Sequence, residues 1–159
     1  MKNKQDGFSL FELLIVVAII GILAAIAIPN LLATRRAANE GSAQSSLRTI
    51  HSAQVVYQAT AGAGAYAGSL AVLRTQTLTD RVLGNGTKSG YTFEIVEQAG
   101  FNSNAVFGVY AFPIITSGVA QTGTRTFGTT EDGVMHGEPD LNAIPNTIAD
   151  IRALPVLGN

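Results

Sequence analysis

The segment GFSLFELLIVVAIIGILAAIAIP, residues 7–29, decides the fold of this chain. Every residue from Leu13 to Ile28 is apolar or glycine, and counting back to Phe8 lengthens the run to about 21 residues. A helix needs about 20 such residues to cross the hydrocarbon core of a bilayer. Glu12 is the one ionisable side chain within the run. The sequence therefore predicts a membrane-spanning helix that begins almost at the first residue.

Glu12 is unusual in such a helix. A charged side chain costs about 2.5 to 3.5 kcal/mol at the bilayer centre and less near the ends of the span. Glu12 follows Phe8 by four residues, which places it about 6 Å along the helix. One explanation is therefore an acid that reaches the headgroups, but the residues around it form a more specific pattern.

The polar heptapeptide MKNKQDG, residues 1–7, precedes the apolar run directly. An ordinary secretory signal peptide ends in a small-residue A-x-A site, which this run lacks. We therefore expect no ordinary cleavage behind the apolar core.

A basic leader ending in Gly7 is followed by Phe8, Ser9, Leu10, Phe11 and Glu12, and then by apolar residues up to Pro29. This order and spacing resemble the N-terminus of type IV pilins and their pseudopilin relatives. The resemblance implies that a prepilin peptidase cuts between Gly7 and Phe8 and that the new Phe8 amine is N-methylated. It also implies that Glu12 neutralises the N-terminal amine of a neighbouring subunit during assembly. Pairing with an ammonium group would remove the cost of a carboxylate in hydrocarbon only when subunits meet in register.

Two residues weaken the span. Glycine costs about 1 kcal/mol against alanine in a helix, and proline removes a hydrogen-bond donor and clashes with the preceding turn. We expect the helix to bend or loosen between Gly21 and Pro29. The resemblance implies that this segment partly melts in the filament, and a plain kinked membrane helix is the alternative.

Composition limits the remaining possibilities. The 159 residues provide for one globular head beside the helix. A net charge of −1, with 13% charged residues, gives no basic field suited to nucleic acid as a primary partner. The chain has no cysteine, which excludes disulfides, thiolate catalysis and cysteine metal sites. A C-terminal loop, which many pilins fix with a disulfide, must here be held by packing or by a metal.

Charge does not orient the protein, because Lys2 and Lys4 before the span balance Arg35 and Arg36 after it. The resemblance does, by placing residues 1–7 in the cytoplasm and the head outside the inner membrane.

The predicted helix has two halves: residues 8–29 form the transmembrane and assembly half, and residues 30–61 form an amphipathic half. Their stripe contains Ala43, Leu47, Ile50, Gln54 and Tyr57. Gly62 and Gly64 are a plausible stop, so that the helix from Phe8 to about Ala61 would be roughly 80 Å long. Residues 62–90 are expected to form a loop with short helical pieces near residues 70–73 and 80–83.

Residues 91–136 carry strand signals. β-Branched and aromatic residues cluster at 91–96, 105–112, 124–129 and 134–136, and residues 130–133 form a turn. The short links favour an antiparallel meander whose apolar face covers the helix stripe. Residues 137–159 contain three prolines and could wrap the sheet or remain loose. The predicted fold is α+β, with a long N-terminal helix packed on a C-terminal antiparallel sheet, as the resemblance to type IV pilins also implies.

Other motifs are weak. Residues 83–89, LGNGTKS, resemble a phosphate loop only loosely, because Thr87 replaces the glycine before Lys88. Asn85, Gly86 and Thr87 form a glycosylation sequon. Four acids could supply oxygens to calcium but more often decorate solvated turns: Glu131, Asp132, Glu138 and Asp140. His51 and His136 show no catalytic or metal-binding spacing. We therefore predict no enzyme activity, no cofactor and no metal.

The sequence favours a structural subunit that is stored in the inner membrane and polymerises, helix against helix, into a type IV pilus on the cell surface. Such a filament supports motility, adhesion or DNA uptake. The partners implied are further copies of the chain, the inner membrane, prepilin peptidase and the pilus assembly machinery. One alternative is a type II secretion pseudopilin, although the short calcium-ligating C-terminal region typical of major pseudopilins is not recognised here. The other is a monomeric binding domain anchored by an uncleaved helix.

Overall fold

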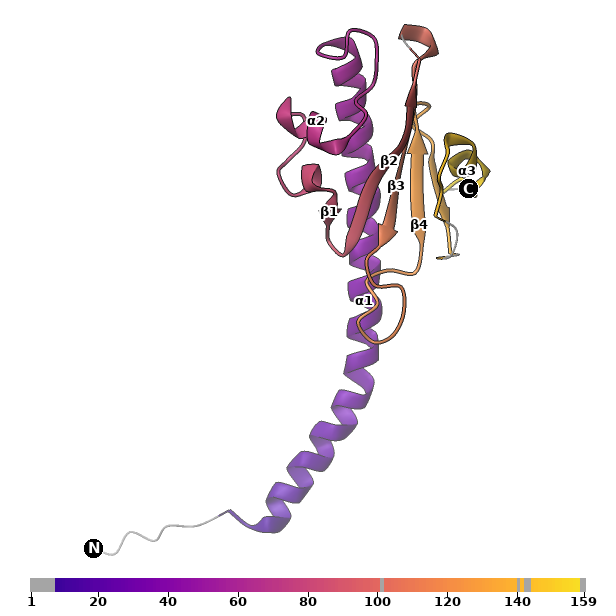
Figure 1. Ribbon diagram of the computed structural model, residues 1–159. Coiled ribbons are helices and arrows are strands. Elements are labelled where there is room, and N and C mark those ends of the chain that lie inside the picture. Colours follow the sequence, from indigo (N-terminus) through magenta and orange to yellow (C-terminus); the bar gives the residue numbers. More distant parts are fainter. Residues whose placement is uncertain (1–7, 101, 140, 142–143, 158–159) are drawn as a thin grey trace, which may run out of the picture. The chain divides into compact units, whose positions relative to one another are not determined.

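The computed structural model describes residues 8–100, 102–139, 141 and 144–157. The chain divides between Thr34 and Arg35 into two units. The first is the apolar part of a helix, and the second contains the remainder of that helix together with the whole sheet. Figure 1 shows the order of the elements along the chain.

The helix α1 spans Leu10–Ala59 and contains Pro29. It begins two residues later and ends two residues earlier than we predicted. The end comes just before the glycines, where the Gly62 amide bonds the Tyr57 carbonyl at 2.7 Å and the chain turns at Gly64 with φ of +98°. Glycine suits this left-handed conformation because it has no Cβ to clash.

The C-terminal half of α1 buries one face. Its buried residues recur at helical spacing: Ala43, Ser46, Leu47, Ile50, Ala53 and Gln54. The predicted stripe is therefore confirmed, with Tyr57 partly buried at its end. Apart from Gln54, the buried side chains are small or aliphatic, which allows a sheet to approach the helix closely.

Gln54 is a polar residue within this stripe, and its hydrogen bonds account for its burial. Its side chain is fully buried, its Nε2 donates to the Ala67 carbonyl at 2.9 Å, and its Oε1 accepts from the Ala67 amide at 2.8 Å. A buried amide group is stable only when its donors and acceptors are paired. Gln54 thus fixes the loop that leaves α1 to the helix itself.

The connecting loop contains a short helix and a 3₁₀ turn. The helix α2 spans Leu70–Thr75, and the turn η1 spans Leu83–Asn85. We predicted helical pieces in both places, and the second begins later than expected. Leu70, Leu73 and Leu83 are buried and join the core, so the loop packs on the head.

Five strands form one antiparallel sheet in the order β1-β2-β3-β4-β5. The strands are β1 (Thr87–Lys88), β2 (Tyr91–Ala99), β3 (Val106–Pro113), β4 (Thr126–Thr130) and β5 (Met135–Glu138). The predicted meander is confirmed, as is the turn between β4 and β5, where the Gly133 amide bonds the Thr130 carbonyl at 3.0 Å. Sequence neighbours pair because short links bring consecutive strands together.

The strand bounds differ from the predicted ones. Strand β2 continues to Ala99 because a register shift between Ile95 and Glu97 inserts an extra residue, which hides the alternation. The two-residue β1 was not predicted, since so short a strand leaves no periodicity. It exists because Gly90 and Ser89, both at positive φ, turn the chain back onto β2.

The two faces of the sheet have different neighbours. Phe107, Val109 and Phe127 belong to the core that includes the α1 stripe. The intervening positions, such as Gly108, point to the opposite face, because side chains alternate along a strand. A helix near the C-terminus, α3 (Ile148–Ala153), covers that face and contacts β3 and β4. Figure 1 shows the sheet between α1 and α3.

The described part of the C-terminal region, residues 144–157, packs along the sheet. The sequence had left open whether this region wraps the sheet or remains loose. Helix α3 begins with a capping box in which the Thr147 side chain accepts from the Asp150 amide and the Asp150 carboxylate accepts from the Thr147 amide. Beyond it the chain pairs with β5: the Gly137 amide bonds the Pro155 carbonyl at 2.9 Å, and the Leu157 amide bonds Met135 at 2.8 Å. Strand pairing and packing hold this region in place of a disulfide.

Candidate functional site in the N-terminal helix

The candidate site is the first turn of α1 and the apolar stretch that follows it. The Glu12 carboxylate accepts from the Ser9 amide at 3.0 Å, and the Ser9 Oγ accepts from the Phe11 amide at 3.3 Å. The Leu13 amide bonds the Ser9 carbonyl at 3.3 Å, which closes the first turn. Ser9 therefore caps the helix, and Glu12 caps Ser9 in return.

This reciprocal cap was missed in the sequence, although its signal, S-x-x-E before an apolar run, is present in Ser9 to Glu12. The cap gives Glu12 a partner within its own chain. It also places a negative charge at a helix N-terminus, where the helix dipole favours it. Glu12 is thus oriented towards the start of the helix by a contact within its own chain.

The apolar stretch is fully accessible. Phe8 is 86% exposed and Phe11 is 68% exposed, and every large aliphatic residue from Leu13 to Ile28 that the structure describes is at least 42% exposed. None of the most apolar window of α1 is buried, and in the described part of the chain α1 is the one helix long and apolar enough to cross a membrane. A surface of this size is stable only in lipid or against other apolar surfaces.

Gly21 and Pro29 both lie within α1, which remains helical through them. A Cβ placed on Gly21 would contact nothing within 4 Å, so packing in this chain does not require the glycine. Their predicted role in loosening the helix stays a prediction. Gly7, the predicted residue before the cleavage site, lies outside the described residues.

Residues 83–89, whose sequence loosely matches a phosphate-binding loop, do not have the structure of one. Lys88, the residue that would contact a phosphate, instead bonds the Asp80 carboxylate at 3.0 Å. The Leu83 amide and Lys88 together lower the pKa of Asp80 below its usual value. Residues 87 and 88 of this segment form strand β1, whereas a phosphate loop leads into a helix.

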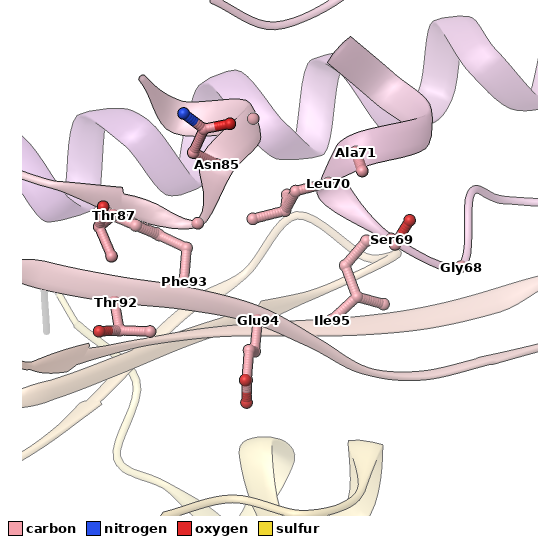
Figure 2. A pocket seen from close by; sticks show the side chains of 12 residues that line it. Gly68, Ser69, Leu70, Ala71, Asn85, Thr87, Thr92, Phe93, Glu94 and Ile95 are labelled. Carbon is pink, nitrogen blue, oxygen red and sulfur yellow. The ribbon is translucent and has the colours of Figure 1, made fainter. Parts of the chain in front are cut away.

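An open groove of about 580 Å³ lies beside this segment, between α2 and β2. Figure 2 shows Leu70 and Ile95 lining it, while Glu94 points to the other side of β2. There Glu94 accepts from the Tyr110 hydroxyl at 2.6 Å, and burial together with this carboxylate raises the pKa of Tyr110. Asn85 of the predicted sequon lines the groove, exposed, and its Oδ1 accepts from Arg74.

Two of the four acids considered for calcium have other partners, and Glu138 is the last residue of β5. Glu131 pairs with Arg152, and Asp132 accepts from the Thr130 hydroxyl at 2.8 Å. Asp140 lies outside the described residues. Within the described part of the chain, no three acids or histidines gather at metal-binding distance.

The two histidines are packed on different elements. The His51 ring lies 5.8 Å from the Phe107 ring on the core side of the sheet. His136 is buried on β5, where its Nδ1 lies 2.7 Å from the Leu154 carbonyl. Both histidines are thus packed within the head.

Comparison with known proteins agrees with this geometry. Residues 2–28 match the family described as the prokaryotic N-terminal methylation motif. The chain is 52% identical over 58 residues to the major component of the wide type IV pilus of Thermus thermophilus. The aligned residues are 36% of this chain and 44% of that protein. It is 77% identical over 30 residues, 19% of each chain, to a type IV major fimbrial protein of Dichelobacter nodosus.

A type II secretion relative is also similar. The chain is 35% identical over 57 residues to core protein G of the type II secretion system of Aeromonas hydrophila. The aligned residues are 36% of this chain and 40% of that protein. The chain therefore spans less than half the length of these relatives. No solved structure matches it. The resemblance to type IV pilins and their pseudopilin relatives is confirmed, and the α+β architecture that it implied is the one observed.

Proposed function

We propose that this chain is a structural subunit of a type IV pilus, which polymerises through α1 into a filament on the cell surface. The observation that carries the proposal is an apolar helical surface, open along its whole length, whose first residues match the methylation motif. Filament cores are built by burying such surfaces against copies of themselves, because burial of apolar area is the main driving force of association. In this reading the chain performs no chemistry.

The proposed route begins in the inner membrane, with residues 8–28 as the span and the leader in the cytoplasm. Prepilin peptidase cuts between Gly7 and Phe8, and the Phe8 amine is methylated. The apolar helices then leave the lipid and pack together with the help of the assembly machinery. Membrane storage fits the length of the apolar run, and extracellular assembly fits the pilus relatives.

Register in the filament would come from Glu12 and the Phe8 amine of a neighbouring copy. A pairing between charges in an apolar core is strong only when the partners are in contact, so misaligned subunits would leave a carboxylate unpaired. The cap from Ser9 supports this role, because it keeps the carboxylate at the end of the helix where a neighbour's amine could reach it.

Gly21 and Pro29 would allow the segment between them to loosen as the filament forms. Pro29 has no amide hydrogen, so the carbonyl of Ala25, one turn before it, receives no intrahelical bond from that position. A filament whose helices can lengthen at this point would extend under load.

The type II secretion relative supports a second candidate, a pseudopilin of a short periplasmic filament. A monomeric anchored binding domain is a third, which leaves the methylation motif without a use. Shearing cells that express the chain and fractionating the product separates the three. A pilin is recovered in sheared extracellular filaments, a pseudopilin stays with the cell envelope at native expression, and an anchored domain forms no polymer. Recovery of the chain in the envelope alone would contradict the pilin proposal.

A further inference from the structure

Asn85 and Gly86, at the end of η1, form the one asparagine–glycine pair of the chain. Asn85 is exposed, and Gly86 has a φ of +84°. An asparagine side chain can react with the backbone nitrogen of the residue that follows it. Glycine hinders this attack least, because it has no side chain. The pair is therefore a candidate for spontaneous chemical modification.

Arg74, on α2, holds the side-chain carbonyl group of Asn85. Its Nη1 donates to Asn85 Oδ1, while Asn85 Nδ2 has no hydrogen-bond partner within the described part of the chain. The stem of Arg74 packs closely on η1, since a Cβ placed on Gly84 would lie 2.6 Å from Arg74 Cβ. A cation is thus held against the carbonyl oxygen, and the amino group that would leave is free.

The contact with Arg74 favours attack on the Asn85 carboxamide. When a nitrogen adds to this group, negative charge develops on the oxygen, and a donor already placed there stabilises that charge. A guanidinium is a stronger donor for such an oxygen than an uncharged group, because its hydrogen bond is charge-assisted. Arg74 is therefore positioned to lower the barrier to addition at Asn85 Cγ.

One hydrogen bond opposes the reaction. The Gly86 amide donates to the Leu83 carbonyl at 2.9 Å, which closes the 3₁₀ turn. The Gly86 nitrogen attacks only when this bond has opened and the amide has lost its proton. Hydrogen bonds of exposed turns open more readily than those of core strands, so we expect the folded chain to react slowly.

We propose that Asn85 deamidates in the folded head with the assistance of Arg74. The Gly86 nitrogen bonds to Asn85 Cγ, the bond between Cγ and Nδ2 breaks, and the amide proton passes through water to the ammonia that leaves. Water then opens the resulting succinimide ring at either carbonyl carbon, which yields aspartate or isoaspartate at position 85. Water is the only other reactant.

The product would change the charge beside the groove between α2 and β2. Asn85 lines this groove, and Glu94 is the one charged residue among the described residues that line it. Figure 2 shows Glu94 on the other side of β2. An aspartate, with an ordinary pKa of about 3.9, is ionised at neutral pH. Deamidation would thus place a carboxylate at the rim of the groove, beside Arg74. The inference concerns the head alone and does not depend on the proposed function.

Peptide mass spectrometry of the purified full chain tests this proposal. The chain is incubated in detergent at neutral and mildly alkaline pH, and near-ultraviolet circular dichroism monitors its fold. Liquid chromatography separates peptides with asparagine, aspartate and isoaspartate at position 85. Asn146 is the matched internal control, because it is also exposed but precedes the β-branched Thr147. Two variants lack the cation: Arg74→Met, which retains an apolar stem over η1, and Arg74→Gln.

We expect position 85 to deamidate about fivefold or more faster than position 146, because glycine follows it, with isoaspartate among the products. In either folded Arg74 variant the rate at position 85 should fall about threefold or more. A rate at position 85 no higher than at position 146 would overturn the site. Aspartate without isoaspartate would exclude the succinimide route and overturn the proposed step. An equal or faster rate in a folded Arg74 variant would contradict the assistance from Arg74.

Discussion

Ser9 and Glu12 cap the first turn of α1 reciprocally, the Ser9 amide donating to the Glu12 carboxylate at 3.0 Å. Glu12 therefore has two separable roles, a cap within its own chain and a proposed partner for a neighbour's amine. The two roles differ in what they require, because an uncharged oxygen can cap a helix but cannot neutralise an ammonium group.

Three substitutions separate the roles. Glu12→Gln retains a cap acceptor without the charge, so we expect normal membrane insertion and strongly reduced filament growth, as for Glu12→Ala. Ser9→Ala is the control, since it loses a cap worth about 1 kcal/mol but retains the charge. We expect it to assemble. Membrane fractionation and electron microscopy of sheared filaments measure both properties, and normal piliation in Glu12→Gln and Glu12→Ala would defeat the registration proposal.

Gln54→Ala should destabilise the head by about 2 to 4 kcal/mol, because it leaves the buried amide and carbonyl of Ala67 unpaired. Gln58→Ala is the control, since Gln58 makes one exposed bond, to the Asn102 carbonyl, and we expect a loss below about 1 kcal/mol. Urea unfolding of the full chain in detergent, followed by near-ultraviolet circular dichroism, measures the difference. Equal losses would mean that Gln54 does not fix the loop.

Gly128→Ala tests the packing of α3. A Cβ on Gly128 would lie 2.8 Å from Ile151 Cγ2, and Ile151 is fully buried. Overpacking of this kind costs about 1 to 3 kcal/mol. Gly41→Ala is the control, because its Cβ meets nothing within 4 Å and alanine favours the helix. Thermal unfolding should show a lowered Tm for Gly128→Ala alone, and combination with Ile151→Ala should give less than the sum of the two losses.

Tyr91 should make the head sensitive to alkali. Burial is the main cause that raises the pKa of its hydroxyl above the ordinary value of 10.0. A raised pKa favours the protonated form in the folded state, so this contribution to stability is complete below pH 10 and is lost as the pH rises above it. Tyr91→Phe should lower stability at neutral pH, through loss of the bond to the Arg125 carbonyl, but reduce the fall in Tm between pH 9 and 11. An unchanged fall would show that Tyr91 does not cause it.

The sequence predicted the elements with strong periodicity. The α1 stripe, with Leu47 and Ile50 at its centre, follows from helical spacing, because burial selects apolar residues at regular intervals. The strands around Phe93 and Val109 follow from clusters of β-branched and aromatic residues. Glu12 is conspicuous in the sequence as the one ionisable residue of the apolar run, but its part in assembly stays a prediction and its cap with Ser9 was missed.

The sequence did not predict features that depend on contacts far along the chain. The C-terminal region pairs with β5 through Pro155 and Leu157, and no local pattern indicates a strand there. Helix α3 is only six residues long, too short for periodicity, although Thr147 and Asp150 carry a readable cap signal. Gly108 and Gly128 are needed because α3 approaches them closely, which only the folded sheet makes visible.

Intact-mass spectrometry with N-terminal fragmentation, on filaments sheared from cells, tests the central proposal most directly. If the chain is a type IV pilin subunit, the filament fraction contains a species that begins at Phe8 with one added methyl group. An unprocessed species beginning at Met1 and confined to membranes would contradict the account and favour a domain anchored by an uncleaved helix.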